Sequence, residues 1–134
     1  MNRLEEQEAN HSLSETLYSK IKGTTFYKIP WDSIQPGEKL TVIRDKYNKY
    51  DSNAIALYYR TAQLGHISKE LAEQFAIALD NRTASMDVYV TEITGGECQF
   101  DMITQAAKKK QYGINIKIVV THNREALANQ FLVS

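Results

Sequence analysis

A polar loop in the first half of the chain gathers the residue types that bind bases and phosphates. It has the sequence Arg44-Asp45-Lys46-Tyr47-Asn48-Lys49-Tyr50-Asp51-Ser52-Asn53. Asparagine and aspartate are common in turns, because their side chains bond to nearby backbone groups and tolerate left-handed conformations. Turn chemistry does not account for two tyrosines interleaved with cationic side chains. Aromatic faces beside charges and amides are what single-stranded bases and phosphates require, which predicts a nucleic-acid-binding loop.

A second polar cluster follows the next apolar stretch, in the segment Leu64-Gly65-His66-Ile67-Ser68-Lys69. His66 and Lys69 flank the predicted start of a helix, where free backbone N–H groups favour an anion. The structural alternative is a histidine fixed at the end of a strand and a solvated lysine. Because the loop and the helix start both follow strands of one predicted sheet, we expect the two clusters to converge in one cleft.

The composition is that of one globular domain. The chain has 134 residues, of which 43% are hydrophobic and 24% are charged, values typical of a folded single domain. The formal net charge is zero, with 16 basic and 16 acidic side chains. A large duplex-binding footprint needs a basic surface, and the overall charge gives no support to one. A compact pocket for one or two nucleotides needs only a few local charges.

The cysteine count and the distribution of apolar residues limit the cellular compartment and the kinds of site that we expect. Cys98 is the only cysteine, so we expect no internal disulfide and no thiolate metal site. The start of the chain is polar and acidic, unlike a signal peptide. No apolar run approaches the roughly 20 residues that cross a membrane. We therefore expect a cytoplasmic protein without a cofactor, a metal or a membrane contact.

The elements that position the two clusters are mostly strands. Alternating or apolar runs rich in β-branched and aromatic residues predict them, and Pro36-Gly37 favours a type II turn. Gly95-Gly96 predicts a hairpin turn between two of these strands, and Lys108–Gln111 is expected to be a basic connector. The predicted strands are Lys20–Phe26, Lys39–Asp45, Ala54–Arg60, Gln63–Ile67, Met86–Thr94, Cys98–Ile103 and the run with Ile114, Ile116, Ile118 and Val120.

One helix is predicted with both ends defined. Ser68 is a suitable N-cap, and the helix should run to Asp80-Asn81. Its apolar residues recur at helical spacing and form one stripe: Leu71, Ala72, Phe75, Ala76 and Leu79. Asn123–Leu132 is predicted as a closing helix, and residues 1–16 as an acidic arm or short helix.

Together these elements predict a mainly β (α+β) fold with one domain over residues 17–134. We expect a small OB-like antiparallel β-barrel, one helix after the third or fourth strand, and terminal helices.

The two clusters, taken in order, resemble a HIRAN domain. The resemblance rests on Arg44-Asp45, on Asn48 to Ile55, and on Leu64-Gly65-His66-Ile67-Ser68-Lys69-Glu70-Leu71-Ala72. Domains of this family occur in fork-remodelling ATPases and in bacterial and phage proteins, sometimes alone. The resemblance implies a barrel related to OB-folds, capture of the 3′ end of single-stranded DNA, and a role in DNA repair or replication. A helicase or a nuclease is the implied kind of protein partner.

The resemblance also implies roles for individual residues. Tyr50 would stack on the terminal base, and Asp51 would accept a hydrogen bond from the 3′-hydroxyl. Asn48 would read a base edge or fix the loop, and His66 and Lys69 would hold phosphates. Two further aromatic residues would stack on bases: Phe26 and Tyr112. The sequence departs from the family at Thr25, where an arginine is usual, and at Lys49, where a proline is common.

Two other function classes compete with nucleic-acid binding. An enzyme could use Asp51 and His66 as an acid–base pair, but the carboxylates near the loop alternate with lysines instead of clustering for metals, and we expect no catalysis. A protein-interaction or assembly module on the same scaffold could expose an aromatic patch. Its candidates are Tyr18, Tyr27, Trp31, Tyr58 and Tyr59.

Overall fold

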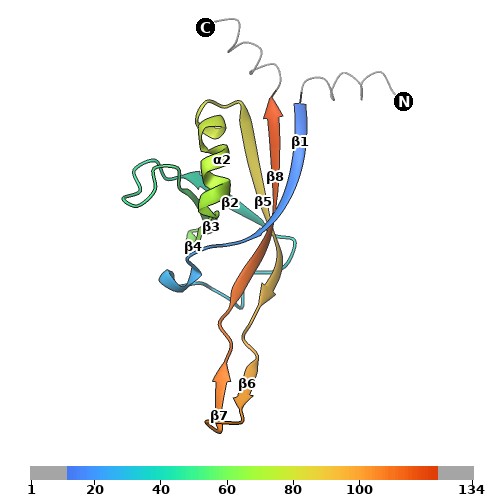
Figure 1. The fold of residues 1–134 in the computed structure, drawn as a ribbon. Coiled ribbons are helices and arrows are strands. Elements are labelled where there is room, and N and C mark those ends of the chain that lie inside the picture. The colour runs from blue at the N-terminus through green and yellow to red at the C-terminus, as the bar shows by residue number, and fades with distance from the viewer. Residues whose placement is uncertain (1–11, 124–134) are drawn as a thin grey trace, which may run out of the picture.

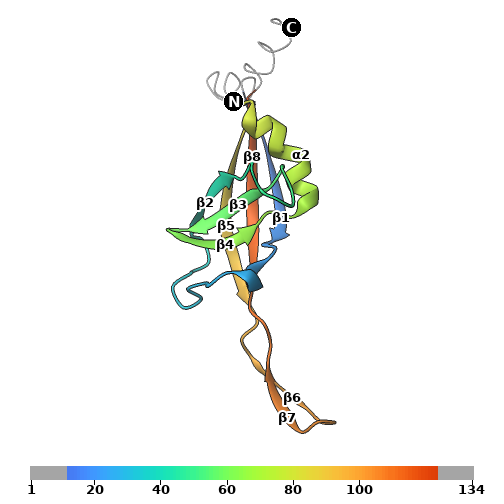
Figure 2. The same cartoon turned by 90° about the vertical axis from the view of Figure 1, so that its left-hand side faces the viewer.

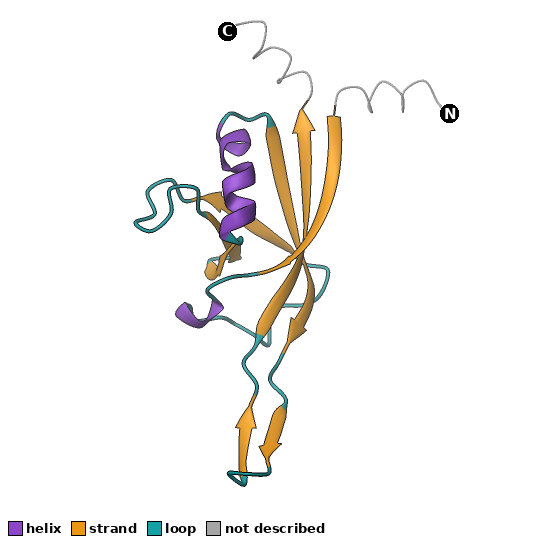
Figure 3. Ribbon diagram, in the orientation of Figure 1, coloured by secondary structure: helices purple, strands orange, loops and turns teal. Residues whose placement is uncertain are grey.

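The computed structural model describes residues 12–123 as an antiparallel sheet with one α-helix packed on it and one hairpin projecting from it (Figures 1 and 3). In chain order the elements are β1 (Ser12–Lys20), the 3-10 helix η1 (Thr24–Phe26), β2 (Lys39–Arg44), β3 (Ile55–Tyr59), β4 (Ala62–His66), α2 (Lys69–Asp80), β5 (Ala84–Thr94), β6 (Cys98–Asp101), β7 (Ala106–Lys109) and β8 (Gly113–Asn123). Six strands form the main sheet in the order β1-β8-β5-β2-β3-β4, and β6 pairs with β7 alone.

The core lies on the face of the sheet that the alternating strands turn inward. Ile114, Ile116, Ile118 and Val120 of β8 are all buried, as the alternation predicted. On the neighbouring strand β5, buried side chains alternate in the same way along much of its length. Period-2 burial on both long strands is what a half-buried sheet requires.

Helix α2 confirms the predicted bounds. The Ser68 hydroxyl accepts a hydrogen bond from the backbone N–H of Leu71 at 3.4 Å, and Asn81 is the C-cap. Ala72, Phe75 and Ala76 are buried, and the helix packs against β5 and β2 (Figure 1). The type II turn is confirmed as well, since Glu38 N donates to Gln35 O across Pro36-Gly37, with Gly37 at φ 91°.

The predicted barrel is not found as a closed barrel. Within the described residues, the segment just after the outer strand β1 meets the end of the other outer strand, β4, in one isolated bridge, Lys22↔His66. In that bridge Lys22 N donates to His66 O and His66 N donates to Lys22 O, both at 2.9 Å. Gly23, at φ 79°, turns the chain into η1 immediately afterwards, so the pairing stops after one residue. The antiparallel sheet with one helix after the fourth strand is as predicted.

The start of the domain also differs from the prediction of a strand over Lys20–Phe26. The first strand lies earlier, at Ser12–Lys20, and residues 24–26 form η1. The reason is backbone pairing, since β1 pairs with β8 from Ser12↔Asn123 to Lys20↔Asn115. Strand β1 therefore crosses the predicted boundary between residues 16 and 17. The rest of the predicted arm, residues 1–11, lies outside the described residues.

The hairpin predicted at Gly95-Gly96 is wrong. Strand β5 pairs with β8 and strand β6 pairs with β7, so the chain reverses at residues 102–105 instead. A Cβ at Gly95 would collide with the carbonyl oxygen of Gln111, and a Cβ at Gly96 would collide with the Tyr112 ring. These glycines permit close approach of the two segments that connect the main sheet to β6 and β7.

Two further segments near the C-terminal half need correction or fall outside the structure. Lys108 and Lys109, predicted within a basic connector over Lys108–Gln111, belong to strand β7. Asn123 ends β8, and the rest of the predicted closing helix, residues 124–132, lies outside the described residues.

Candidate nucleic-acid interface

A cleft of about 740 Å³ opens where four segments meet: η1, the loop between β2 and β3, the end of β4 and the start of α2. It contains six of the seven predicted site residues, namely Phe26, Asn48, Tyr50, Asp51, His66 and Lys69. The remaining lining residues are Lys22, Gly23, Tyr27, Ala54 and Ile67. The two polar clusters therefore converge in one cleft, as expected from their places after strands of one sheet.

Asn48 holds the loop in shape. Its side-chain Oδ1 accepts hydrogen bonds from the backbone N–H groups of Tyr50 at 2.9 Å and Asp51 at 3.1 Å. Its Nδ2 donates to Asp45 Oδ2 at 3.0 Å. With the carbonyl and the amide both engaged inside the loop, the geometry favours the loop-fixing role of Asn48 over the reading of a base edge.

Phe26 and Tyr50 offer the aromatic faces of the cleft. Phe26 is 85% exposed and Tyr50 is 94% exposed, although burial of such rings is strongly favourable. They come from segments far apart in the sequence, η1 and the β2–β3 loop. Two exposed rings at one cleft form a surface on which bases can stack.

Asp51 retains acceptor capacity. Its Oδ1 accepts a hydrogen bond from Asn53 N at 2.9 Å, which fixes the carboxylate at the cleft. Its Oδ2 has no hydrogen-bond partner within residues 12–123. An ionised carboxylate is an acceptor only, so this oxygen can receive a ligand hydroxyl and would repel a ligand phosphate.

His66 and Lys69 differ in how they face the cleft. His66 Nε2 is buried without a hydrogen-bond partner in the described part of the chain, 3.8 Å from Asp45 Oδ2. A phosphate contact from His66 would therefore use its Nδ1. Lys69, the first residue of α2, is exposed. Its ammonium and the first N–H groups of the helix both attract an anion.

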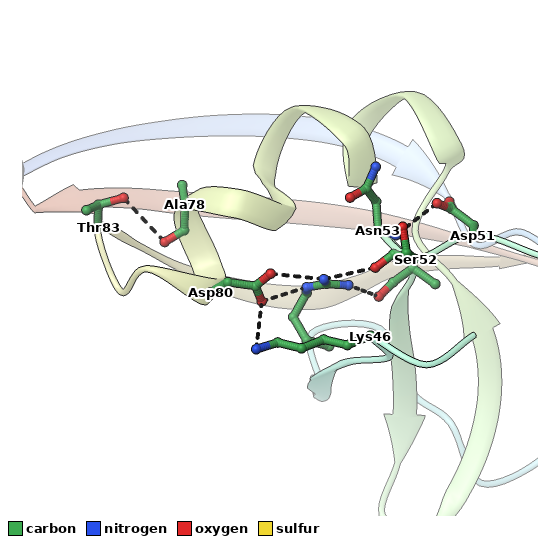
Figure 4. A network of polar contacts seen from close by, with 9 residues as sticks. Lys46, Asp51, Ser52, Asn53, Ala78, Asp80 and Thr83 are labelled. Atoms are coloured by element: carbon green, nitrogen blue, oxygen red, sulfur yellow. Dashed lines mark hydrogen bonds and ion pairs between the residues drawn. The ribbon is translucent and has the colours of Figure 1, made fainter. Parts of the chain in front are cut away.

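Arg44 ties the loop to Asp80, the last residue of α2 (Asp80 is labelled in Figure 4). Its guanidinium donates to both carboxylate oxygens of Asp80, at 2.9 and 3.0 Å, and to the carbonyl oxygens of Ala54 at 2.7 Å and Ser52 at 3.0 Å. Lys46 Nζ lies 3.8 Å from Asp80 Oδ1. The Arg44 hydrogen bonds hold the pKa of the Asp80 carboxyl below its ordinary value.

Replacing this carboxylate should destabilise the domain in a pH-dependent way. A lowered folded-state pKa means that Asp80 adds stability above its unfolded pKa of about 3.9, and that this stability is lost as pH falls through the folded value. At pH 7 we expect Asp80→Asn to lower the free energy of unfolding by about 1–2 kcal/mol, since it removes charge-assisted hydrogen bonds. Urea unfolding at pH 7 and pH 3 measures the difference between the two proteins. If the difference in free energy of unfolding between the two proteins stays the same at pH 3 as at pH 7, the ionised Asp80 carboxylate is not the source of this stability.

Tyr112 is the one predicted site residue outside the cleft. It lies in a neighbouring groove of about 420 Å³ with Thr24, Thr25, Trp31, Lys109, Lys110 and Gln111. Its ring stacks on Trp31 at a centroid distance of 4.8 Å, and Lys109 Nζ lies 5.0 Å from the ring centroid. Tyr27 lines both hollows, so the groove adjoins the cleft at this residue.

Sequence reasoning did not place Lys22 and Tyr27 at the site. The predicted strand ends at Phe26, which the family resemblance assigns to the ligand, and Tyr27 is considered only for a protein-interaction patch. In the 3-10 geometry that replaces the strand, both rings line the cleft. The Tyr27 hydroxyl accepts a hydrogen bond from Gln63 Nε2 at 3.1 Å. Burial, together with nearby Tyr58 and Asp45, raises the Tyr27 pKa, which leaves this ring a neutral surface.

Two features of residues 12–123 concern metal binding and membrane insertion. No group of three or more histidine, cysteine, aspartate or glutamate side chains there is arranged to hold a metal ion. None of the helices in this part of the chain has the length and apolar character needed to span a membrane.

Three solved structures share this fold. The crystal structure of the HIRAN domain of human HLTF is 23% identical, with a TM-score of 0.62 over 87% of this chain and 84% of that chain. An NMR structure of the HLTF HIRAN domain in its DNA-bound conformation is 20% identical, with a TM-score of 0.54 over 86% and 82%. A crystal structure of a protein from Lactobacillus plantarum is 17% identical, with a TM-score of 0.57 over 84% and 99%. At these identities the likeness concerns the fold alone.

No curated protein matches the chain. The HIRAN domain family matches it over residues 14–122, a span that contains every strand except the ends of β1 and β8, and all of the cleft. By this match, which covers most of its length, the chain belongs to the HIRAN domain family.

Proposed function

We propose that this chain is a nucleic-acid-binding module that captures the 3′-hydroxyl end of single-stranded DNA in the cleft. One observation carries the proposal: two exposed aromatic rings, an acceptor carboxylate and a helix-start lysine line the same hollow. The structure of the HLTF HIRAN domain in a DNA-bound conformation supports DNA as the ligand class. The family match extends that support to this chain.

Each group has a distinct task in this proposal. The rings of Tyr50 and Phe26 stack on bases, a contact that tolerates any sequence because every base has a π-face. Asp51 Oδ2 accepts the hydrogen bond of the terminal hydroxyl. Lys69 and the start of α2 hold a phosphate, with the Nδ1 of His66 beside them. Asn48 keeps the loop in the conformation that presents Tyr50 and Asp51.

The chemistry of the strand end provides the main test. A free 3′-hydroxyl donates to Asp51, whereas a 3′-phosphate places negative charge against the carboxylate. We expect a 3′-phosphate to weaken binding several-fold or more. Asp51→Ala should reduce this preference more than it lowers total affinity. Fluorescence anisotropy with short single strands that carry a free, phosphorylated or blocked 3′ end measures both effects, with a 5′-phosphorylated strand as the control.

Two results would count against the proposal. Equal affinity for strands with 3′-hydroxyl and 3′-phosphate ends would contradict end recognition but not nucleic-acid binding. No affinity for any strand would remove both. The cleft is proposed to bind without catalysis, and incubation of labelled strands with Mg²⁺ or Mn²⁺ tests this, because cleavage would overturn it.

The aromatic residues predicted as a contact patch for a protein partner are mostly buried or half-buried. Tyr59 is buried, Tyr27, Trp31 and Tyr58 are half-buried, and Tyr18 is the exposed member of the predicted set. The Tyr58 hydroxyl donates to Gln63 Oε1 at 3.1 Å. A partner such as a helicase or a nuclease stays a prediction. Co-purification of such a protein, without any shift of labelled strands, would favour the alternative.

A further inference from the structure

A two-stranded arm projects beyond the main sheet. We define the arm as residues 97–110, which contain β6 and β7 and the turn between them (Figures 1 and 2). Among residues 12–123 its strands pair only with each other, from Cys98↔Lys109 to Asp101↔Ala106. Residues 100–110 are all exposed. An isolated hairpin is only marginally stable in water, so an arm of this kind contributes little to the stability of the domain.

The end of the arm carries apolar side chains that nothing in the described chain covers. Phe100 is 61% exposed, Met102 is 80% exposed and Ile103 is 94% exposed. Asp101 builds the turn that presents them, because its Oδ1 accepts hydrogen bonds from Ile103 N at 2.8 Å and Thr104 N at 3.2 Å. A built turn with a cluster of exposed apolar residues indicates a contact surface.

The base of the arm is cationic and adjoins the site. Lys108, Lys109 and Lys110 follow one another, and Lys110 Nζ lies 3.6 Å from Glu97 Oε1. Lys109 and Lys110 line the groove of Tyr112 and Trp31, which shares Tyr27 with the cleft. A strand that leaves the cleft across Tyr27 therefore reaches the lysines at the base of the arm before it reaches the apolar end.

We propose that the arm contacts double-stranded DNA at the point where the single strand held in the cleft leaves its duplex. This inference rests on the proposed function of the cleft. The lysines at the base meet the phosphates of the strand. Phe100, Met102 and Ile103 pack on the exposed face of the last base pair, whose π-surface accepts aromatic and apolar side chains.

Continuity and charge favour DNA over a protein as the occupant. The groove shares Tyr27 with the cleft and is lined by Lys109 and Lys110, and stacked aromatic rings beside cations are the surface that a nucleic-acid strand prefers. The contact is local, involving one base pair and a few phosphates, which agrees with a net charge of zero. Binding should consequently lose little affinity as salt rises.

The test compares two DNA probes and three variants. The first probe is a single strand with a free 3′ end, and the second is a duplex that carries the same strand as a 3′ overhang of about four nucleotides. In the first variant Asn-Gly replaces residues 98–109, which suits a two-residue hairpin turn because Lys110 N already donates to Glu97 O at 2.9 Å. The second variant combines Phe100→Ser, Met102→Ser and Ile103→Ser. The matched control is Ile77→Ser, which changes an exposed aliphatic side chain of α2.

We expect the unmodified chain to bind the overhang duplex roughly tenfold more tightly than the single strand, the gain of one stacking contact. The serine variant should lose this gain and keep its affinity for the single strand, while Ile77→Ser should keep both. The shortened chain should lose the gain too, and it should bind the single strand more weakly because it also lacks Lys108 and Lys109. An unchanged affinity ratio in the serine variant, with single-strand binding intact, would overturn the inference and assign the apolar end to a protein partner. Failure of all proteins to bind the single strand would overturn the proposed function and this inference with it. Thermal unfolding checks that the shortened chain folds.

Discussion

Replacing Gly65 by alanine should lower the free energy of unfolding by about 3 kcal/mol and weaken ligand binding at the same time. Gly65 has a φ of 149°, and a Cβ there would collide with the carbonyl oxygen of Lys22 and lie 2.8 Å from Ile21 Cγ2. The Lys22 carbonyl accepts the bond from His66 N that joins the segment after β1 to the end of β4. Relief of the collision therefore moves Lys22 and His66, which both line the cleft.

Gly37→Ala is the matched control for this change. Gly37 also has a positive φ, of 91°, but no atom lies within 4 Å of its added Cβ. Gly37→Ala should therefore add backbone strain without a collision. We expect it to lower the free energy of unfolding by about 1 kcal/mol and to leave ligand binding intact. Urea unfolding and anisotropy titration of both variants separate the effect of backbone strain from the effect of the steric collision. Equal destabilisation by Gly65→Ala and Gly37→Ala would show that the close approach of the two segments contributes nothing.

Loss of both exposed rings should abolish most of the affinity for single strands. Base–aromatic stacking contributes about 1–3 kcal/mol for each base, or roughly five- to 150-fold in the dissociation constant. We expect Tyr50→Ala and Phe26→Ala each to weaken binding within that range. The double variant should weaken it by the product if the rings hold separate bases, and by less if they hold one base between them.

Tyr47→Ala is the control for these variants. Tyr47 lies in the same loop and is as exposed as Tyr50, but it does not line the cleft. Anisotropy titration of all four variants with one 3′-hydroxyl strand makes the comparison, with circular dichroism as the check of folding. A loss of affinity in Tyr47→Ala equal to that in Tyr50→Ala would place the stacking surface on the outside of the loop.

The parts that the sequence predicted well are those that local chemistry decides. Helix α2 begins and ends as expected because its N-cap, Ser68, and its apolar stripe are sufficient to define it. The alternation of β8 shows directly in its burial. The loop at Asn48 is likewise local, since its hydrogen bonds join residues at most three positions apart. These signals brought six predicted residues into one cleft, although their role in binding stays a prediction.

The errors lie where distant pairing decides the structure. Strand β1 has modest burial and few apolar residues, and it is a strand because β8 offers a free edge along its whole length. Gly95-Gly96 has the composition of a hairpin turn, but the strands on either side of it pair elsewhere, β5 with β8 and β6 with β7. Arg44 in the motif appeared to be a cation for the ligand. Its partner Asp80, 36 positions away, shows that it supports the loop.

The pairing of the first described strand with the last affects the order in which the domain can fold during its synthesis. Ser14 and Thr121, whose hydroxyls lie 3.4 Å apart, are separated by 107 positions, and β8 also lies between β1 and β5 in the sheet. On the ribosome, β1 must wait for β8 to be synthesised before it has any partner strand. Because such non-local pairings close slowly, we expect Lys22, two positions after β1, to reach His66 only after β8 has been synthesised. We therefore expect the cleft to be among the last features of the domain to form.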